Sequence, residues 1–278
     1  MYLNIIISII YYMKIVIFGS TGMLGLYVYK VLYKNYEVIC INRNEFDILN
    51  DKWIKLKNIL NNYNKNDIII NCAGIIPQKV DSTQYKEYIC INSLFPHKLQ
   101  EICNNKNMKL IHITTDCVYN GFKGNYSPND NHTTNTIYGI TKSLGEPDEA
   151  TVIRTSIIGE QLLTKKSLLE WIKTNKNNKI NGFTNHYWNG VTCLTLAKII
   201  KYIIQDNIFW KGVRHIYSPD IVSKYDLCCY INKIYDLNID ISPIANDYTK
   251  NMTLTDENIF NIDNIYNQIL ELKEFNIY

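Results

Sequence analysis

Residues 14–25 read KIVIFGSTGMLG, a short apolar run followed at once by Gly19, Gly22 and Gly25. An apolar run without polar alternation indicates a strand that is covered on both faces of its sheet. Glycines at the following turn let the backbone bend sharply and approach a pyrophosphate, whose charge the N-terminus of the next helix stabilises. The stretch therefore predicts a strand, turn and helix that bind a dinucleotide, with a tight turn that binds no ligand as the alternative.

Outward from this stretch, apolar runs alternate with amphipathic segments. Such alternation predicts an α/β fold with a doubly wound parallel sheet, the Rossmann arrangement. Beyond about residue 160 the alternation loosens. We therefore expect a Rossmann domain over 13–160 and, over 161–278, mainly a smaller substrate-binding lobe from which some strands and helices return to the core. The expected strands are 14–18, 37–41, 67–71, 109–114 and 151–155, and the expected helices are 22–34, 51–63, 89–105, 138–146, 165–175, 193–206 and 223–237, the last with Ser223 as N-cap.

Composition narrows the class of protein. The eight cysteines form no CxxC pair, which favours reduced core residues over disulfides or a metal site. The net charge of +3 is too small and too evenly spread for a nucleic-acid-binding surface. Residues 1–12, MYLNIIISIIYY, lack a basic leader and are too short to span a bilayer. We interpret them as an N-terminal extension ahead of Met13, with a weak signal anchor as the alternative, and expect a cytoplasmic protein without membrane or nucleic-acid partners.

The GxxGxxG spacing of the glycines resembles that of the extended short-chain dehydrogenase/reductase superfamily. An acid at the end of the second strand binds the ribose hydroxyl of NAD, whereas a cation there accommodates the 2′-phosphate of NADP. Here the strand ends at Arg43 with no acid before Glu45, which favours NADPH, with NADH and a merely solvated Arg43 as alternatives. The predicted cofactor-binding residues are Gly19, Thr21, Gly22, Met23, Leu24, Gly25, Arg43, Asp47, Ile48, Cys72, Ala73, Gly74, Tyr138 and Lys142, of which Cys72 is better explained as a small buried residue.

Tyr138 and Lys142 form a YxxxK pair within a stretch that reads as helix, so both side chains share one face. The other such pair, Tyr119 with Lys123, spans an Asn-Gly turn in which no fixed spacing holds. An ammonium beside a phenol lowers the pKa of the phenol, which predicts Tyr138 as a proton donor near neutrality. Thr115, at the end of the fourth strand, is predicted to orient a substrate carbonyl, and the three residues follow the order of the superfamily's Ser/Thr-Tyr-Lys triad.

Four segments narrow the resemblance: TTDCVYNG (114–121), YGITKSLGE (138–146), VIRTSIIGE (152–160) and GVRHIYSPDIVSKYDL (212–227). They resemble the corresponding segments of the dTDP-4-dehydrorhamnose reductase family. The resemblance implies hydride transfer from a nicotinamide to the 4-ketone of a nucleotide-linked 6-deoxyhexose. It also implies that Lys142 holds the nicotinamide ribose.

Cys117 departs from this pattern, because plain dTDP-rhamnose reductases usually carry an aromatic residue there. GDP-fucose synthases and the 3,5-epimerase/4-reductases that make UDP-rhamnose have a cysteine two residues beyond the triad Ser/Thr, as here. A thiol whose pKa is brought towards neutrality can exchange the acidic C3 proton, which predicts a 3-epimerase activity. A small apolar residue is an equally good interpretation of Cys117. Inversion of C3 also needs an acid on the other face of the carbon. GDP-fucose synthases use a histidine from the C-terminal region, which suggests His186. A surface histidine without a catalytic role is an equally good interpretation of His186.

The segment 186–192, HYWNGVT, resembles a stretch of enzymes that act on UDP-4-keto-6-deoxy-N-acetylhexosamines. It favours a UDP-linked substrate, possibly 2-acetamido, over a dTDP-linked one. Two alternatives stay open: a dTDP-4-dehydrorhamnose reductase without epimerase activity, and an NADP-binding regulatory subunit, against which the intact triad argues. A homodimer also stays open.

Overall fold

The computed structural model describes residues 13–278 except 79, 163–165, 258, 276 and 278, so the interpretation of 1–12 lies outside the described residues. Its centre is a six-stranded sheet in the order β10-β5-β4-β3-β1-β2, in which every pairing is parallel. The predicted doubly wound sheet is confirmed. The sixth strand, β10, comes from beyond residue 160. The strands are β1 (Lys14–Phe18), β2 (Glu37–Ile41), β3 (Ile68–Asn71), β4 (Lys109–Thr115), β5 (Thr151–Thr155) and β10 (Gly212–His215).

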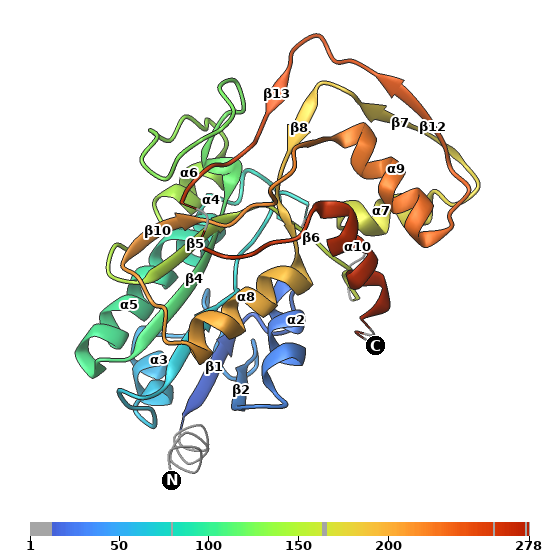
Figure 1. Ribbon diagram of the computed structural model, residues 1–278. Helices are drawn as coiled ribbons and strands as arrows, with labels where there is room; N and C mark the ends of the chain where they lie inside the picture. Colours follow the sequence, from blue (N-terminus) through green and yellow to red (C-terminus); the bar gives the residue numbers. More distant parts are fainter. Residues whose placement is uncertain (1–12, 79, 163–165, 258, 276, 278) are drawn as a thin grey trace.

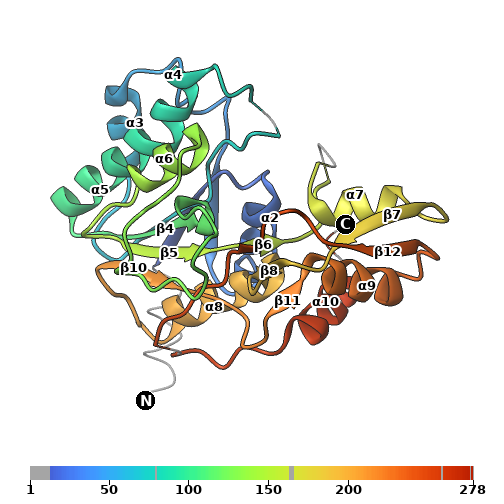
Figure 2. The same ribbon diagram turned by 90° about the horizontal axis from the view of Figure 1, so that it is seen from above.

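Helices cover both faces of this sheet (Figures 1 and 2). Along β1, Ile15 and Ile17 belong to the core on one face, while Val16 and Phe18 belong to the core on the other. Burial on both faces explains why the strand is continuously apolar. On the first face lie α2 (Met23–Leu32) and α8 (Cys193–Gln205), and on the second lie α3 (Trp53–Leu60), α4 (Tyr85–Tyr88), the π-helical segment η1 (Ile89–Leu94), α5 (Phe95–Lys106) and α6 (Ile137–Ser143).

The remaining elements form a lobe beyond the carboxyl ends of the central strands (Figure 1). Its sheets are small, and several strands contain only two residues. Hydrogen bonds tie the lobe to the loop that follows β4: the Asn251 amide donates to the Gly121 carbonyl at 2.6 Å. That loop begins with η2 (Asp116–Val118). The elements of the lobe are β6 (Ile157–Ile158), α7 (Leu168–Thr174), β7 (Lys179–Phe183), β8 (His186–Trp188), β9 (Val191–Thr192), β11 (Val222–Ser223), α9 (Lys224–Tyr235), β12 (Asp240–Ile244), β13 (Lys250–Asn251) and α10 (Ile265–Glu274).

The predicted N-cap of α9 is confirmed. Ser223 Oγ accepts a hydrogen bond from the Asp226 amide at 3.0 Å, and the Asp226 carboxylate accepts one from the Ser223 amide at 3.0 Å. This reciprocal arrangement satisfies two amide groups that a helix start otherwise leaves unpaired. It fixes the first turn of α9, which faces the carboxyl edge of the central sheet. In the described part of the chain, no helix is long and apolar enough to cross a membrane.

Candidate active site

The glycine loop between β1 and α2 is packed too closely to accept side chains. A Cβ at Gly19, whose φ is +78°, would lie 2.6 Å from the Ala73 amide nitrogen, and one at Gly25 would lie 2.1 Å from the Gly19 carbonyl oxygen. Gly22 is the N-cap of α2, and no side chain caps that helix. The amide groups of the first turn are therefore available to an anion, which is the arrangement that binds a pyrophosphate.

A pocket of about 220 Å³ adjoins this loop and gathers three of the segments predicted to bind the cofactor. Predicted residues in its wall are Gly19, Thr21, Gly22, Arg43, Asp47, Ile48, Cys72, Ala73 and Gly74. Met23, Leu24 and Gly25 lie outside the wall, in the first turn of α2. The sequence reasoning missed seven lining residues, among which Ile91 comes from the π-helical segment, where no motif marked it. The others are Phe18, Ser20, Ile41, Asn42, Phe46 and Ile75.

Arg43 stands at this pocket with its side chain 71% exposed. Its Nε lies 3.6 Å from Asp47 Oδ2. Burial raises the pKa of Asp47, but hydrogen bonds from Asn50 and Leu49 and the Arg43 charge outweigh it, so the pKa lies below its ordinary value. Among the described residues the guanidinium is held by this one exposed ion pair, whose energy is small, so it can turn towards a 2′-phosphate.

The three triad candidates meet at the carboxyl end of β4. Thr115 is the last residue of β4, and its hydroxyl accepts a hydrogen bond from the Cys117 amide at 3.2 Å and lies 3.1 Å from Asp116 Oδ1, to which it donates. Tyr138 is the second residue of α6, and its phenol lies near enough to the Thr115 hydroxyl for Thr115 to act on the pKa of the phenol. Lys142, on the same helix face, donates to the Ile113 carbonyl at 2.8 Å. A Cβ at Gly74 would lie 4.0 Å from Lys142 Nζ, so the ammonium reaches the wall of the cofactor pocket.

The acidities in this triad differ from the prediction. Burial raises the pKa of the Tyr138 phenol, and the nearby Thr115 hydroxyl only partly offsets the rise. The prediction of a lowered Tyr138 pKa is therefore wrong, because burial dominates and the Lys142 ammonium is bound to a backbone carbonyl. Burial also lowers the pKa of Lys142 to about 8. Tyr138 is thus held as a neutral phenol, which is the form that donates a proton to a ketone.

Cys117 also differs from expectation. Its Sγ lies 3.6 Å from Asp116 Oδ1, and burial together with the Asp116 carboxylate raises the pKa of the thiol to about 12. The thiol is therefore protonated near neutrality, and the expected shift towards neutrality is not found. Asp116 is itself buried, which raises its pKa, while Thr115 and Lys224 act in the opposite direction.

His186 lies in β8 of the C-terminal lobe. Its ring stacks on Phe183 with the centroids 4.5 Å apart, and its Nε2 lies 3.5 Å from Asn246 Nδ2. Burial lowers the pKa of His186, and the charges of Lys250 and Lys224 lower it further. Within the described ranges no hydrogen bond joins His186 to Cys117, although both side chains interact electrostatically with Lys224 and Lys250.

The second YxxxK pair has a structural role, as the sequence indicated. The Tyr119 hydroxyl donates to the Ser127 carbonyl at 2.8 Å and accepts from Arg154 Nη1 at 2.5 Å, while Lys123 pairs with Asp130 at 2.6 Å. No hydrogen bond joins the Tyr119 and Lys123 side chains, both of which the structure describes.

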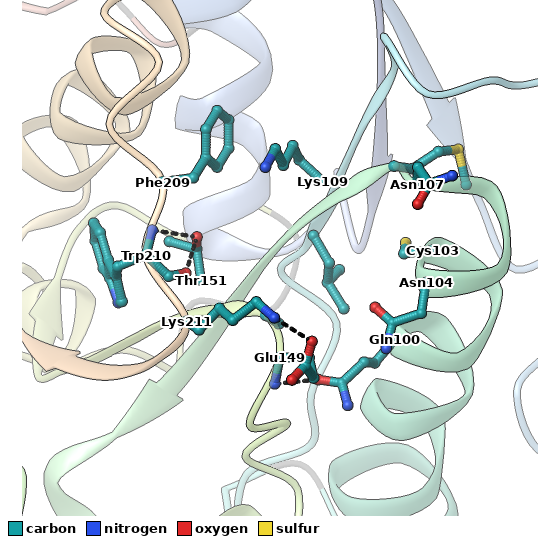
Figure 3. A pocket seen from close by; sticks show the side chains of 13 residues that line it. Gln100, Cys103, Asn104, Asn107, Lys109, Glu149, Thr151, Phe209, Trp210 and Lys211 are labelled. Carbon is teal, nitrogen blue, oxygen red and sulfur yellow. Dashed lines mark hydrogen bonds and ion pairs between the residues drawn. The ribbon is translucent and has the colours of Figure 1, made fainter.

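A larger cavity, of about 590 Å³, lies at the opposite edge of the sheet (Figure 3). It is bordered by the amino ends of β4 and β5 and by α5, and Lys211 pairs with Glu149 across it at 2.6 Å. Ligands of parallel α/β sheets bind at the carboxyl ends of the strands. Size alone therefore does not locate the site, and the smaller pocket, whose Gly74 wall Lys142 reaches, is the candidate.

Comparison with known proteins agrees with this geometry. The sequence profile of a family described as the RmlD substrate binding domain matches residues 13–256. A dTDP-4-dehydrorhamnose reductase of Aggregatibacter actinomycetemcomitans is 27% identical over an alignment of 234 residues, and the match covers 78% of each chain. A dTDP-4-keto-6-deoxy-D-glucose reductase of Streptomyces niveus is 25% identical over 222 residues, 75% of this chain and 74% of that one. The crystal structure of dTDP-4-dehydrorhamnose reductase from Bacillus anthracis in complex with NADP superposes with a TM-score of 0.80 at 18% identity, covering 93% of this chain and 97% of that one.

Proposed function

This chain belongs to the RmlD substrate binding domain family, and we propose that it is an NADPH-dependent reductase of the 4-ketone of a nucleotide-linked 6-deoxyhexose. The observation that carries the proposal is the meeting of Thr115, Tyr138 and Lys142 beside the pocket of the glycine loop. The names of the relatives, which are dTDP-4-keto-sugar reductases, support this choice of substrate class.

The residues around the pocket fit a dinucleotide, because its glycine cradle would be filled by a single Cβ at Gly19 or Gly25. NADPH, when bound, supplies the hydride. The open amide groups of α2 would hold the pyrophosphate and Arg43 the 2′-phosphate. Lys142, whose ammonium reaches the Gly74 segment, would bind the nicotinamide ribose.

At the ketone, the neutral Tyr138 phenol would donate its proton to O4 as hydride arrives at C4. Thr115 would hold the ketone beside the phenol. To do so its hydroxyl would turn its proton from Asp116 to O4, while the Thr115 oxygen still accepts the hydrogen bond of the Cys117 amide. Proton donation by a positioned side chain contributes about 10²- to 10⁴-fold to a rate.

Arg43→Ala tests the choice of cofactor. We expect the KM for NADPH to rise about tenfold or more, since the substitution removes a charge-assisted hydrogen bond to the 2′-phosphate. The KM for NADH should stay within about twofold, because NADH has no 2′-phosphate for Arg43 to bind. Initial rates with each cofactor give both constants. Equal changes in the KM for NADPH and the KM for NADH would show that Arg43 does not bind the 2′-phosphate.

A second candidate activity is 3-epimerisation, on a UDP-linked and possibly 2-acetamido sugar. It rests on the position of Cys117 two residues beyond Thr115 and on the HYWNGVT segment that contains His186. Against it stands the thiol, whose pKa of about 12 leaves almost no thiolate near neutrality to act as the base. The simple reductase is therefore the first choice.

One experiment tests both activities: proton NMR in deuterated water with dTDP- and UDP-linked 4-keto-6-deoxyglucose and the UDP-linked 2-acetamido analogue, before and after NADPH is added. We expect reduction at C4 once NADPH is present and no deuterium at C3 before it. Deuterium at C3 that disappears in Cys117→Ser would establish the epimerase instead. Absence of reduction with every sugar, although NADPH binds, would favour the regulatory subunit.

A further inference from the structure

Lys224 occupies a fixed place at the edge of the candidate site. It is the first residue of α9, directly after the reciprocal cap made by Ser223 and Asp226. Its Nζ lies 5.0 Å from the centroid of the Trp188 ring, so the Lys224 side chain packs on that ring. The cap and the ring together hold the ammonium towards the carboxyl edge of the central sheet.

The Lys224 ammonium has no hydrogen-bond or ion-pair partner among the residues that the structure describes. The residue is half-buried, and burial lowers the pKa of the ammonium, an effect that Asp116 opposes most. An ammonium offers three donors, and leaving them unpaired away from water is unfavourable. An acceptor from a ligand would satisfy them.

The surroundings of Lys224 indicate which acceptor. It interacts electrostatically with Asp116 and Cys117, the two residues that follow Thr115. It does not line the pocket of the glycine loop, which leaves it the sugar side of the triad. Lys250 is a second cation in the same region. A dianionic diphosphate placed between Lys224 and Asp116 would be repelled by the carboxylate, whereas a neutral sugar hydroxyl can accept from the cation without that repulsion.

We propose that Lys224 is a further substrate-contacting residue, which donates a hydrogen bond to an oxygen substituent of the hexose next to the reacting ketone. The proposal rests on the nucleotide-sugar substrate given above. It makes Lys224 a determinant of sugar specificity contributed by the C-terminal lobe, opposite the triad on the Rossmann sheet.

Binding to the full-length enzyme with NADP⁺ tests the contact without turnover. The ligands are dTDP-glucose and UDP-glucose, which have no ketone to reduce, and the free nucleotides dTDP and UDP, which have no sugar. In Lys224→Met we expect the Kd of the bound nucleotide-glucose to rise about 10- to 100-fold, as for loss of a charged hydrogen bond, and the Kd of the free nucleotide to change less than about twofold. Lys233→Met is the matched control, because it removes another cation that lies over a ring, Tyr266 at 5.5 Å, from the same helix.

Several outcomes would overturn the assignment. If the Kd of the free nucleotide and that of the nucleotide-glucose rose equally, Lys224 would contact the diphosphate and not the sugar. If the Kd changed no more than in Lys233→Met, Lys224 would not contact the substrate. Should Lys224→Met fail to fold, Lys224→Gln carries the same comparison. Wild-type enzyme that binds the nucleotide-glucose through Lys224 but reduces no 4-keto sugar would refute the proposed reductase and leave the contact standing. No binding of either nucleotide-glucose would refute both.

Discussion

Tyr138→Phe is expected to lower kcat for 4-keto reduction by about 10²- to 10⁴-fold, while the Kd for NADPH stays within about twofold. The substitution removes one oxygen, the donor of the proton to O4. It keeps the ring that packs in the buried site. Stopped-flow or steady-state oxidation of NADPH gives the rate, and fluorescence titration gives the Kd.

Tyr85→Phe is the control for this change, because the Tyr85 side chain on α4 is 57% exposed and is not among the residues that form the candidate site. It should retain full activity. If Tyr138→Phe kept more than about a tenth of the wild-type rate, another group would have to donate the proton. The buried Asp116, whose pKa is raised by burial, would then be the first group to replace, with Asn.

Glu146→Ala is expected to lower the free energy of unfolding by about 3–5 kcal/mol, because it leaves a buried cation without its partner. Arg154 is 1% exposed, and its Nε and Nη2 donate to the two Glu146 carboxylate oxygens at 3.0 and 2.6 Å. His132 Nε2 and His215 Nε2 also lie within 3.0 Å of the guanidinium, but a neutral imidazole does not balance its charge. The midpoint of thermal unfolding should fall by about 6 °C or more.

Glu149→Ala provides the comparison, since its partner Lys211 is 70% exposed. An exposed pair contributes about 0–1 kcal/mol, so the thermal midpoint should hardly move. Equal effects of the two substitutions would mean that Arg154 is stabilised mainly by its other partners. Because Glu146 lies just beyond α6, activity measured below the melting range would also show whether the pair helps to hold Tyr138 and Lys142.

The central sheet could be predicted because most of its strands are short apolar runs, which can be recognised from neighbouring residues alone. The runs at 14–18, 37–41 and 151–155 coincide with β1, β2 and β5. The small strands of the C-terminal lobe could not be predicted. Pairs such as Ile157 with Val191, or Val222 with Trp188, are short and join distant residues, so tertiary packing and not periodicity decides them.

The candidate site divides in the same way. A strand end marked Thr115 and one helical turn paired Tyr138 with Lys142, and both are local features. The order of the superfamily's triad joined the three residues. The acidity of Cys117 depends on how deeply the fold buries it and on its neighbour Asp116, and a sequence pattern gives neither. Lys224 was missed because nothing local shows that the first residue of α9 faces the triad, although it lies in one of the quoted segments.

The position of β10 limits how this enzyme can diversify. This strand pairs with β5 along Val152 and Ile153, and it is encoded between α8 and α9, well inside the half that also holds Lys224. A recombination event at residue 160 that brought in a foreign C-terminal half would have to bring a matching edge strand as well, or leave the backbone of β5 open to other chains. New sugar specificities are therefore more accessible through point substitutions and loop changes around α9 and β13 than through exchange of the whole lobe.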